Sequence, residues 1–181
     1  MTLITKVILL LGACAISACQ SGTSQKSESN MATLHSTSKD QIDDNVMVSE
    51  TAKRNQKIVD DAFNNWVAGK GSFFDLLADD VVWQVTGKAP FSGVYRGKQE
   101  FMDKAVTPIN DFLSTSIKPE LIDINASEDI VWLQWKGIAT AKDGGQYINE
   151  YAWKLKFDAE GKVIRADAFL DTYTLSKLVR Q

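Results

Sequence analysis

The chain contains few of the residues that stabilise small domains by cross-links or supply histidine and metal chemistry. Its 181 residues include two cysteines, one histidine and three prolines. Cys14 and Cys19 lie near the N-terminus, and His35 stands in a polar stretch. We therefore expect no disulfide, no metal site and no histidine base in the rest of the chain.

Positive charge is also limited and is not concentrated anywhere. Twenty lysines and arginines stand against 23 aspartates and glutamates, which gives a formal net charge of −3. The basic residues are scattered, so the sequence offers no electrostatic footprint for nucleic acid. The apolar share of 44% and the length fit one ordinary globular domain with appendages.

Residues 1–18 have the pattern of an export signal. Lys6 precedes an apolar run, Val7 to Ala18, that is too short to span a membrane. The run ends in Ile16-Ser17-Ala18-Cys19, which resembles the bacterial lipobox, whose cysteine is acylated and becomes the new N-terminus. We expect a signal peptide over 1–18, lipid on Cys19, and anchoring to a bacterial membrane, the outer membrane facing the periplasm.

Two alternatives at the N-terminus are less favourable. Leu11-Gly12-Ala13-Cys14 fits the same motif, but cleavage there would leave an apolar run of about seven residues, the minimum for export. A disulfide between Cys14 and Cys19 is disfavoured because both lie in or beside the segment to be removed. Residues 19–50 are polar and lack an apolar period, so we expect a lipidated cysteine with a disordered tether, and a folded domain over 51–181.

The domain shows helical periodicity first and strand alternation afterwards. Helices are expected at residues 51–68 and 73–78 and from 98 onward, with an end or restart at Pro108. Strands are expected at residues 81–85, 117–125, 130–141, 147–157 and 163–170. Helices that precede a meander of strands predict an α+β fold with helices on one face of a curved antiparallel sheet.

The hairpin over residues 147–172 is the most informative stretch. Its first strand places an amide, Asn149, between Tyr147 and Tyr151 on an otherwise aromatic face. A polar group there must be hydrogen-bonded or face a cavity. The turn, Asp158 to Gly161, has the acceptor and glycine of a type I turn followed by a bulge.

Two registers of this hairpin remain open. Turn chemistry favours pairing Phe157 with Val163, which puts Asn149 opposite Asp171 on the pocket face. The small apolar set Ala166, Ala168 and Leu170 favours pairing Phe157 with Lys162 instead, because one residue of slip exchanges the two faces. Asp171 is accordingly either a pocket acid or a helix-capping residue.

Four runs, at residues 76–85, 93–101, 147–153 and 161–172, stand in the order and spacing of a known family. LLADDVVWQV, GVYRGKQEF, YINEYAW and GKVIRADAFLDT together resemble the SnoaL-like group of the nuclear transport factor 2-like (ketosteroid isomerase-like) superfamily. The resemblance implies an α+β roll, a cone in which a bent sheet wraps against three helices. That fold hosts isomerases, hydratases, cyclases, epoxide hydrolases and binding modules.

The residues that match the catalytic positions of these relatives are mostly apolar. The base, the tyrosine donor and the protonated acid of ketosteroid isomerases fall at Val85, near Ala62 and at Trp153. Their mechanism is therefore not expected. Asp171 matches the base of limonene epoxide hydrolases, although a tyrosine that assists it is replaced by Trp83.

These comparisons predict a pocket that binds a small apolar or aromatic molecule without a cofactor. Asp171 is the candidate general base, with a pKa raised by an aromatic pocket. An enzyme of this kind would be an isomerase, cyclase or hydrolase. The alternative is a non-catalytic interaction module, such as a homodimer formed through the open sheet face. The expected lining residues are Trp66, Trp83, Phe101, Trp135, Asn149, Tyr151, Trp153 and Phe169.

Overall fold

The computed structural model describes the backbone of residues 40–180 and the side chains from Glu50 onward. The expected export signal, Cys19 and the tether up to residue 39 lie outside these residues. Within them the α+β prediction is confirmed. A curved six-stranded sheet, with strand order β2-β1-β6-β5-β4-β3, is packed against helices and does not close into a barrel.

Helix α1 (Asp40–Val67) begins before Thr51, where the pattern predicted its start. Residues 40–50, which their composition assigns to the tether, are therefore helical. They contain neither glycine nor proline, so nothing in them interrupts a helix that extends backwards from the apolar stripe. The helix ends as predicted before Gly69, whose N–H donates to the Trp66 carbonyl at 3.0 Å. The φ of 68° at Gly69 turns the next N–H, that of Lys70, back to the Asn65 carbonyl at 2.8 Å.

A short 3₁₀ helix, η1 (Phe73–Leu76), connects α1 to the sheet. Ser72 and Asp75 form the predicted capping box. The Ser72 hydroxyl accepts from the Phe74 N–H at 3.2 Å, and the Asp75 carboxylate accepts from the Ser72 N–H at 3.1 Å. Strand β1 (Leu77–Val85) then begins earlier than expected and pairs with β2 (Gly93–Arg96).

One helical segment follows β2 and changes its winding before Pro108. It comprises α2 (Lys98–Phe101), a π-helical turn, η2 (Met102–Val106), and α3 (Thr107–Asn110). Proline has no N–H and its ring collides with the carbonyl four residues earlier, so the wider π turn accommodates it. The helix restarts with Pro108 in its first turn, as the sequence predicted.

The remaining strands form an antiparallel meander, and the last of them pairs with β1. These strands are β3 (Lys118–Ser127), β4 (Ile130–Thr140), β5 (Gln146–Phe157) and β6 (Val163–Leu170). Strand β6 runs parallel to β1, which is the one exception to the expected antiparallel pairing within the described sheet. Helix α4 (Thr172–Leu178) follows directly. The periodicity predicted no helix over these residues, although the capping alternative for Asp171 implied one.

The β5–β6 register combines both predicted alternatives. Phe157 pairs with Val163, as the turn requires, but Lys156 pairs with Arg165, so Ile164 is an extra residue in a bulge. Beyond the bulge the faces are exchanged. Alanines 166 and 168 and Leu170 therefore lie on the inner face, as the alternative register predicted, and Phe169 lies on the outer face.

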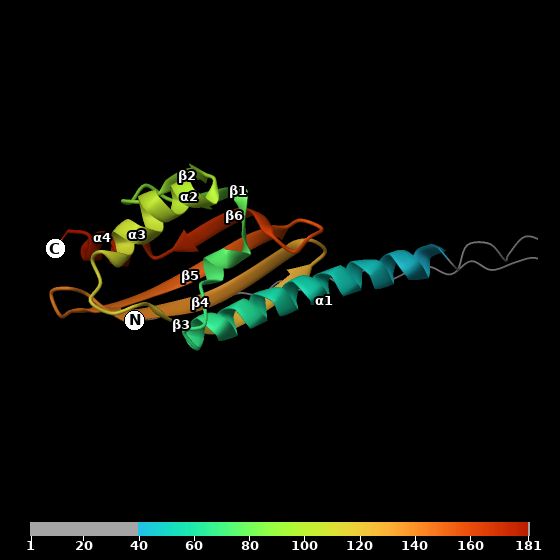
Figure 1. The fold of residues 1–181 in the computed structure, drawn as a ribbon, viewed down its shortest axis with the longest axis horizontal. Helices are drawn as coiled ribbons and strands as arrows, with labels where there is room; N and C mark the ends of the chain where they lie inside the picture. The colour runs from blue at the N-terminus through green and yellow to red at the C-terminus, as the bar shows by residue number, and fades with distance from the viewer. Residues whose placement is uncertain (1–39, 181) are drawn as a thin grey trace, which may run out of the picture. The chain divides into compact units, whose positions relative to one another are not determined.

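Helix α1 lies along β3 and β4, and α2 lies beside β1 and β2 (Figure 1). Both helices contribute buried side chains to one core against the inner face of the sheet. Phe63 of α1 contacts Trp135 edge to face at 5.9 Å, and Phe101 of α2 stacks on Trp83 at 4.4 Å. At one end of the sheet, α1 also covers the β5–β6 turn. Arg54 donates to the Ala159 carbonyl at 3.1 Å there.

Gly161 offers a test of the contact between α1 and the turn. Its φ is +84°, and a Cβ would lie 2.9 Å from Ile58 Cδ1. Gly144 has a similar φ of +88° with nothing within 4 Å. Gly144→Ala should cost about 1 kcal/mol of unfolding free energy from backbone strain alone. Gly161→Ala should cost roughly 0.5–1 kcal/mol more, because the end of the Ile58 side chain has to move out of its preferred position. Equal losses in urea denaturation would contradict the contact.

Candidate ligand-binding site

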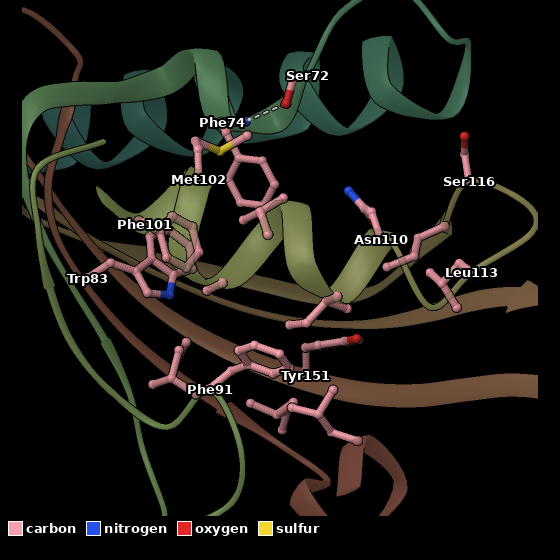
Figure 2. A pocket seen from close by; sticks show the side chains of 18 of the residues that line it. Ser72, Phe74, Trp83, Phe91, Phe101, Met102, Asn110, Leu113, Ser116 and Tyr151 are labelled. Atoms are coloured by element: carbon pink, nitrogen blue, oxygen red, sulfur yellow. Dashed lines mark hydrogen bonds between the residues drawn. The ribbon is translucent and has the colours of Figure 1, made fainter. Parts of the chain in front are cut away.

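A cavity of about 520 Å³ lies between the inner face of the sheet and the helices (Figure 2). Most of the side chains that line it are apolar, and many are aromatic. They come from α1, η1, β1, β4, β5, β6, α4 and the helical segment before β3. The apolar members include Trp66, Phe74, Trp83, Phe91, Phe101, Met102, Val106, Ile109, Leu113, Trp135, Trp153, Ala168, Leu170 and Leu175.

Stacked aromatic rings make the wall of this cavity rigid. Trp135 and Tyr151 stack at 4.0 Å with planes 7° apart. Trp153 stands edge-on to Trp135 at 4.8 Å and to Trp83 at 5.1 Å. Each ring is thus held by at least one neighbour in a preferred geometry, so the cavity exists before any ligand arrives.

The structure places six of the eight expected lining residues on this wall. They are Trp66, Trp83, Phe101, Trp135, Tyr151 and Trp153. Phe169 is instead 41% exposed on the outer face, because the bulge at Ile164 exchanges the faces of β6. There it stacks on Trp132, which is 45% exposed.

Asn149 is buried behind the wall and does not line the cavity. Its side-chain amide bridges to the backbone of Asp171, with Oδ1 accepting from the N–H and Nδ2 donating to the carbonyl, both at 3.1 Å. Nδ2 also donates to the Tyr147 hydroxyl at 3.0 Å. Its side chain is 2% exposed and fully hydrogen-bonded, which was one of the two outcomes expected for a polar group on this face.

The tyrosines on either side of Asn149 are joined to each other. The hydroxyls of Tyr147 and Tyr151 lie 2.9 Å apart. Burial raises the pKa of Tyr147 above its ordinary value, and it raises the pKa of Tyr151 well above it. Both hydroxyls therefore keep their protons at neutral pH, and Tyr151 presents a neutral side chain to the cavity.

Asp171 is the N-cap of α4 and is not among the residues that line the cavity. Its carboxylate accepts from the Tyr173 N–H at 2.9 Å and from the Thr174 hydroxyl at 2.6 Å. Hydrogen bonds from Thr174 lower the pKa of this exposed carboxyl. The prediction of a raised pKa is wrong, since the side chain is solvated and capped instead of lying in an aromatic pocket. The geometry supports the capping alternative for Asp171.

The mouth of the cavity is polar and uncharged. Its exposed lining residues come mainly from the segment between α3 and β3 and from the start of η1: Ser72, Asn110, Ser114, Thr115 and Ser116. Figure 2 shows Asn110 and Ser116 on the same side of the opening. Among the described residues that line the cavity, none is an acid, lysine, arginine, histidine or cysteine.

Sequence reasoning missed the helical wall and the mouth. Met102, Ala105, Val106 and Ile109 line the cavity from the segment around the π turn. Their apolar period was visible, but such a stripe is indistinguishable from ordinary core until the opposite face is known. Phe91 was missed because it stands in a glycine-rich loop, with φ of 65°, where its carbonyl accepts from Tyr95 at 2.7 Å.

The described part of the chain has no group of three or more side chains placed to hold a metal ion. In the same residues no helix has the length and apolar character needed to cross a membrane.

Comparison of the fold identifies its architecture. An NTF2-like protein from Burkholderia thailandensis superposes with a TM-score of 0.59 at 18% identity, over 70% of this chain and 98% of its own. This chain has the nuclear transport factor 2-like fold. No protein-family model matches the sequence. No curated protein matches it significantly either.

Two further structures share the nuclear transport factor 2-like fold. A putative SnoaL-like polyketide cyclase from Jannaschia sp. has a TM-score of 0.56 at 12% identity, over 71% of this chain and 93% of its own. TerC, co-crystallised with polyporic acid, has a TM-score of 0.56 at 15% identity, over 70% of this chain and 98% of its own. At these identities the likeness concerns the fold alone.

The role of Asp171 as a cap gives a stability prediction. Asp171→Ala should lower the unfolding free energy by about 1 kcal/mol at neutral pH, whereas Asp171→Asn should lose much less because asparagine is also a good N-cap. Because the folded pKa is lowered, the carboxylate stabilises the fold fully above its unfolded pKa and loses this effect as the pH falls through the folded value. Urea denaturation across pH 2–7 would measure both effects. Equal stability of wild type and Asp171→Ala would contradict the cap.

Proposed function

We propose that the domain binds a small, neutral, largely apolar molecule in the cavity of its nuclear transport factor 2-like fold. The observation that carries this proposal is a preformed cavity of about 520 Å³ whose wall is aromatic and whose lining, in the described residues, has no ionised side chain. Cavities of a few hundred Å³ lined mainly by apolar groups are typical of small-molecule sites.

The neutral lining restricts the class of ligand. A carboxylate or ammonium moved into this cavity would lose its water without gaining an opposite charge, which costs several kcal/mol. An aromatic or polycyclic neutral molecule instead exchanges water for stacked rings such as Trp83 and Trp153.

Binding without acid–base turnover is the form of the proposal that the geometry favours. Proton transfer needs a positioned side chain with a pKa near the working pH. Tyr151 is the titratable residue on the cavity wall, and burial raises its pKa well above that range. If the chain is an enzyme, a cyclase or isomerase that works by holding its substrate in one conformation is the version compatible with this wall.

We further propose that the domain is held at a bacterial membrane by an acylated Cys19. A binder of this kind would meet apolar molecules where they partition, at the lipid surface. Fatty-acid labelling in a bacterial host should be lost in Cys19→Ser and retained in Cys14→Ser, because Cys14 would leave with the signal peptide. Labelling that persists in Cys19→Ser and disappears in Cys14→Ser would move the anchor to the other cysteine.

A second function is favoured by the outer sheet face. Trp132 and Phe169 are both more than two-fifths exposed there and stack at 6.2 Å. Exposed aromatic pairs are common at protein interfaces, and the nearby Lys154 ammonium lies 5.9 Å from the Trp132 ring. This arrangement suits an interaction module or homodimer, which would make the cavity incidental.

Matched naphthalene probes test the proposed cavity. 2-Ethylnaphthalene should raise the melting temperature and quench the fluorescence of the tryptophans that line the cavity, since binding stabilises the folded state. 2-Naphthoate, of similar size but anionic, should bind roughly tenfold more weakly or worse. Both affinities come from one fluorescence titration.

Two variants separate the cavity from the outer face. Ala105→Phe, which fills the cavity from the helical wall, should abolish probe binding, whereas Trp132→Ala should leave it unchanged. Equal binding by wild type and Ala105→Phe would place the probe elsewhere. Failure of every neutral probe, together with a dimer that persists on dilution and dissociates in Trp132→Ala, would favour the interaction module.

A further inference from the structure

The Tyr151 hydroxyl ends a chain of hydrogen bonds whose direction can be followed from the backbone. The chain starts at Asp171, whose N–H donates to Asn149 Oδ1 and whose carbonyl accepts from Asn149 Nδ2. Since a backbone N–H cannot accept and a carbonyl cannot donate, these two bonds fix which end of the amide is nitrogen. The nitrogen end is the one that faces Tyr147.

The fixed amide determines the role of Tyr147. Nδ2 of Asn149 has two hydrogens, one directed to the Asp171 carbonyl and the other to the Tyr147 oxygen at 3.0 Å. Tyr147 is 2% exposed, and among the described residues its own hydroxyl hydrogen has one acceptor within reach, the Tyr151 oxygen at 2.9 Å. The reverse order would bury an unsatisfied donor at Tyr147, which costs about 1–3 kcal/mol.

The favoured order leaves the Tyr151 hydroxyl hydrogen without a protein acceptor among the described residues. Tyr151 lines the cavity, and Figure 2 shows it projecting from the sheet toward the enclosed space, across from Asn110 and Leu113. Burial raises the pKa of Tyr151 well above neutral pH, so this hydrogen stays in place. The free hydrogen is thus directed by the fold toward the ligand space.

A second unused donor lies on the ring that stacks against Tyr151. Trp135 also lines the cavity, is 2% exposed, and its Nε1 has no hydrogen-bond partner. Buried polar groups nearly always have partners, so an unpaired N–H at this position requires a specific explanation, such as strain or an ordered water. Gly137 permits this stack, because a Cβ there would lie 3.1 Å from Trp135 and 3.2 Å from Tyr151.

We propose that Tyr151 is the specificity-determining residue of the cavity, and that its hydroxyl donates a hydrogen bond to an uncharged acceptor oxygen, such as a ketone or quinone carbonyl, on an otherwise apolar ligand. The inference rests on the proposed binding function. Asn149 and Tyr147 are positioning residues, since they touch no ligand and act by fixing the direction of the hydroxyl.

A ketone and its hydrocarbon counterpart test this role. 2-Acetylnaphthalene and 2-ethylnaphthalene have similar shapes, but the ketone alone has an acceptor. Tyr151→Phe should weaken ketone binding by about five- to tenfold, the value of one net hydrogen bond, and should change hydrocarbon binding by less than about twofold. Because each probe is compared with itself, differences in hydration between the two probes cancel.

A spectroscopic readout separates donation from packing. The carbonyl stretch of bound 2-acetylnaphthalene should fall below its frequency in alkane, and Tyr151→Phe should return it toward the alkane value. Tyr147→Phe keeps the ring of Tyr147 but removes the donor to Tyr151, so it should shift the frequency while leaving hydrocarbon affinity unchanged. The wild-type frequency alone decides the point if Tyr151→Phe does not fold.

The binding of the two probes and the carbonyl frequency together decide the inference. Hydrocarbon binding without any ketone effect of Tyr151→Phe, or an alkane-like carbonyl frequency in the wild type, would overturn the inference and leave the proposed function standing. Failure of both probes to bind the wild type would overturn both. Selective loss of the ketone in Tyr151→Phe, with the frequency change, would establish the donor.

Discussion

The architecture of the site depends on one extra residue in β6. The turn at Gly161 requires Phe157 to face Val163, and the core requires the small residues of β6 to face inward. These two requirements differ by one position. The bulge at Ile164 satisfies both requirements, because it exchanges the two faces of β6 only for the residues that follow it. The bulge leaves alanines at positions 166 and 168 beneath the helices and puts Phe169 outside.

Because small residues of β6 lie on the inner face, the interior keeps a cavity. Two alanines on β6 and a glycine, Gly137, on β4 stand among tryptophans and phenylalanines from neighbouring elements. Large aromatic rings packed beside small residues leave a cavity that a uniformly aliphatic core would have filled. An unfilled apolar cavity lowers stability, so this arrangement of side chains costs the fold some packing energy.

Local patterns in the sequence specified most of the fold. Alternation of apolar and polar residues predicted the hairpin strands, and the capping box predicted η1. Pro108 predicted the restart of the third helix. The start of α1 was not predicted, since polar residues alone give no helical period. The short α4 was not assigned a range because seven residues show too little period, although the capping alternative for Asp171 implied a helix there. The direction of Asp171 and Phe169 could not be predicted, because it depends on a bulge that arises from competition between turn and core. The residues at the mouth of the cavity could not be predicted either, since serine and threonine in a loop have no periodicity that would place them beside a pocket.

Helix α4 has a kinetic consequence for the cavity. It contributes Leu175 to the wall, and the backbone of its N-cap residue, Asp171, is held by the Asn149 amide. If this terminal turn frayed, one side of the cavity would open and the amide would be released in the same event. The free energy of that local opening, smaller than that of global unfolding, would then limit how long a bound molecule stays. The residence time of a ligand would then be set by α4, through the same residue whose backbone orients the hydrogen-bond chain.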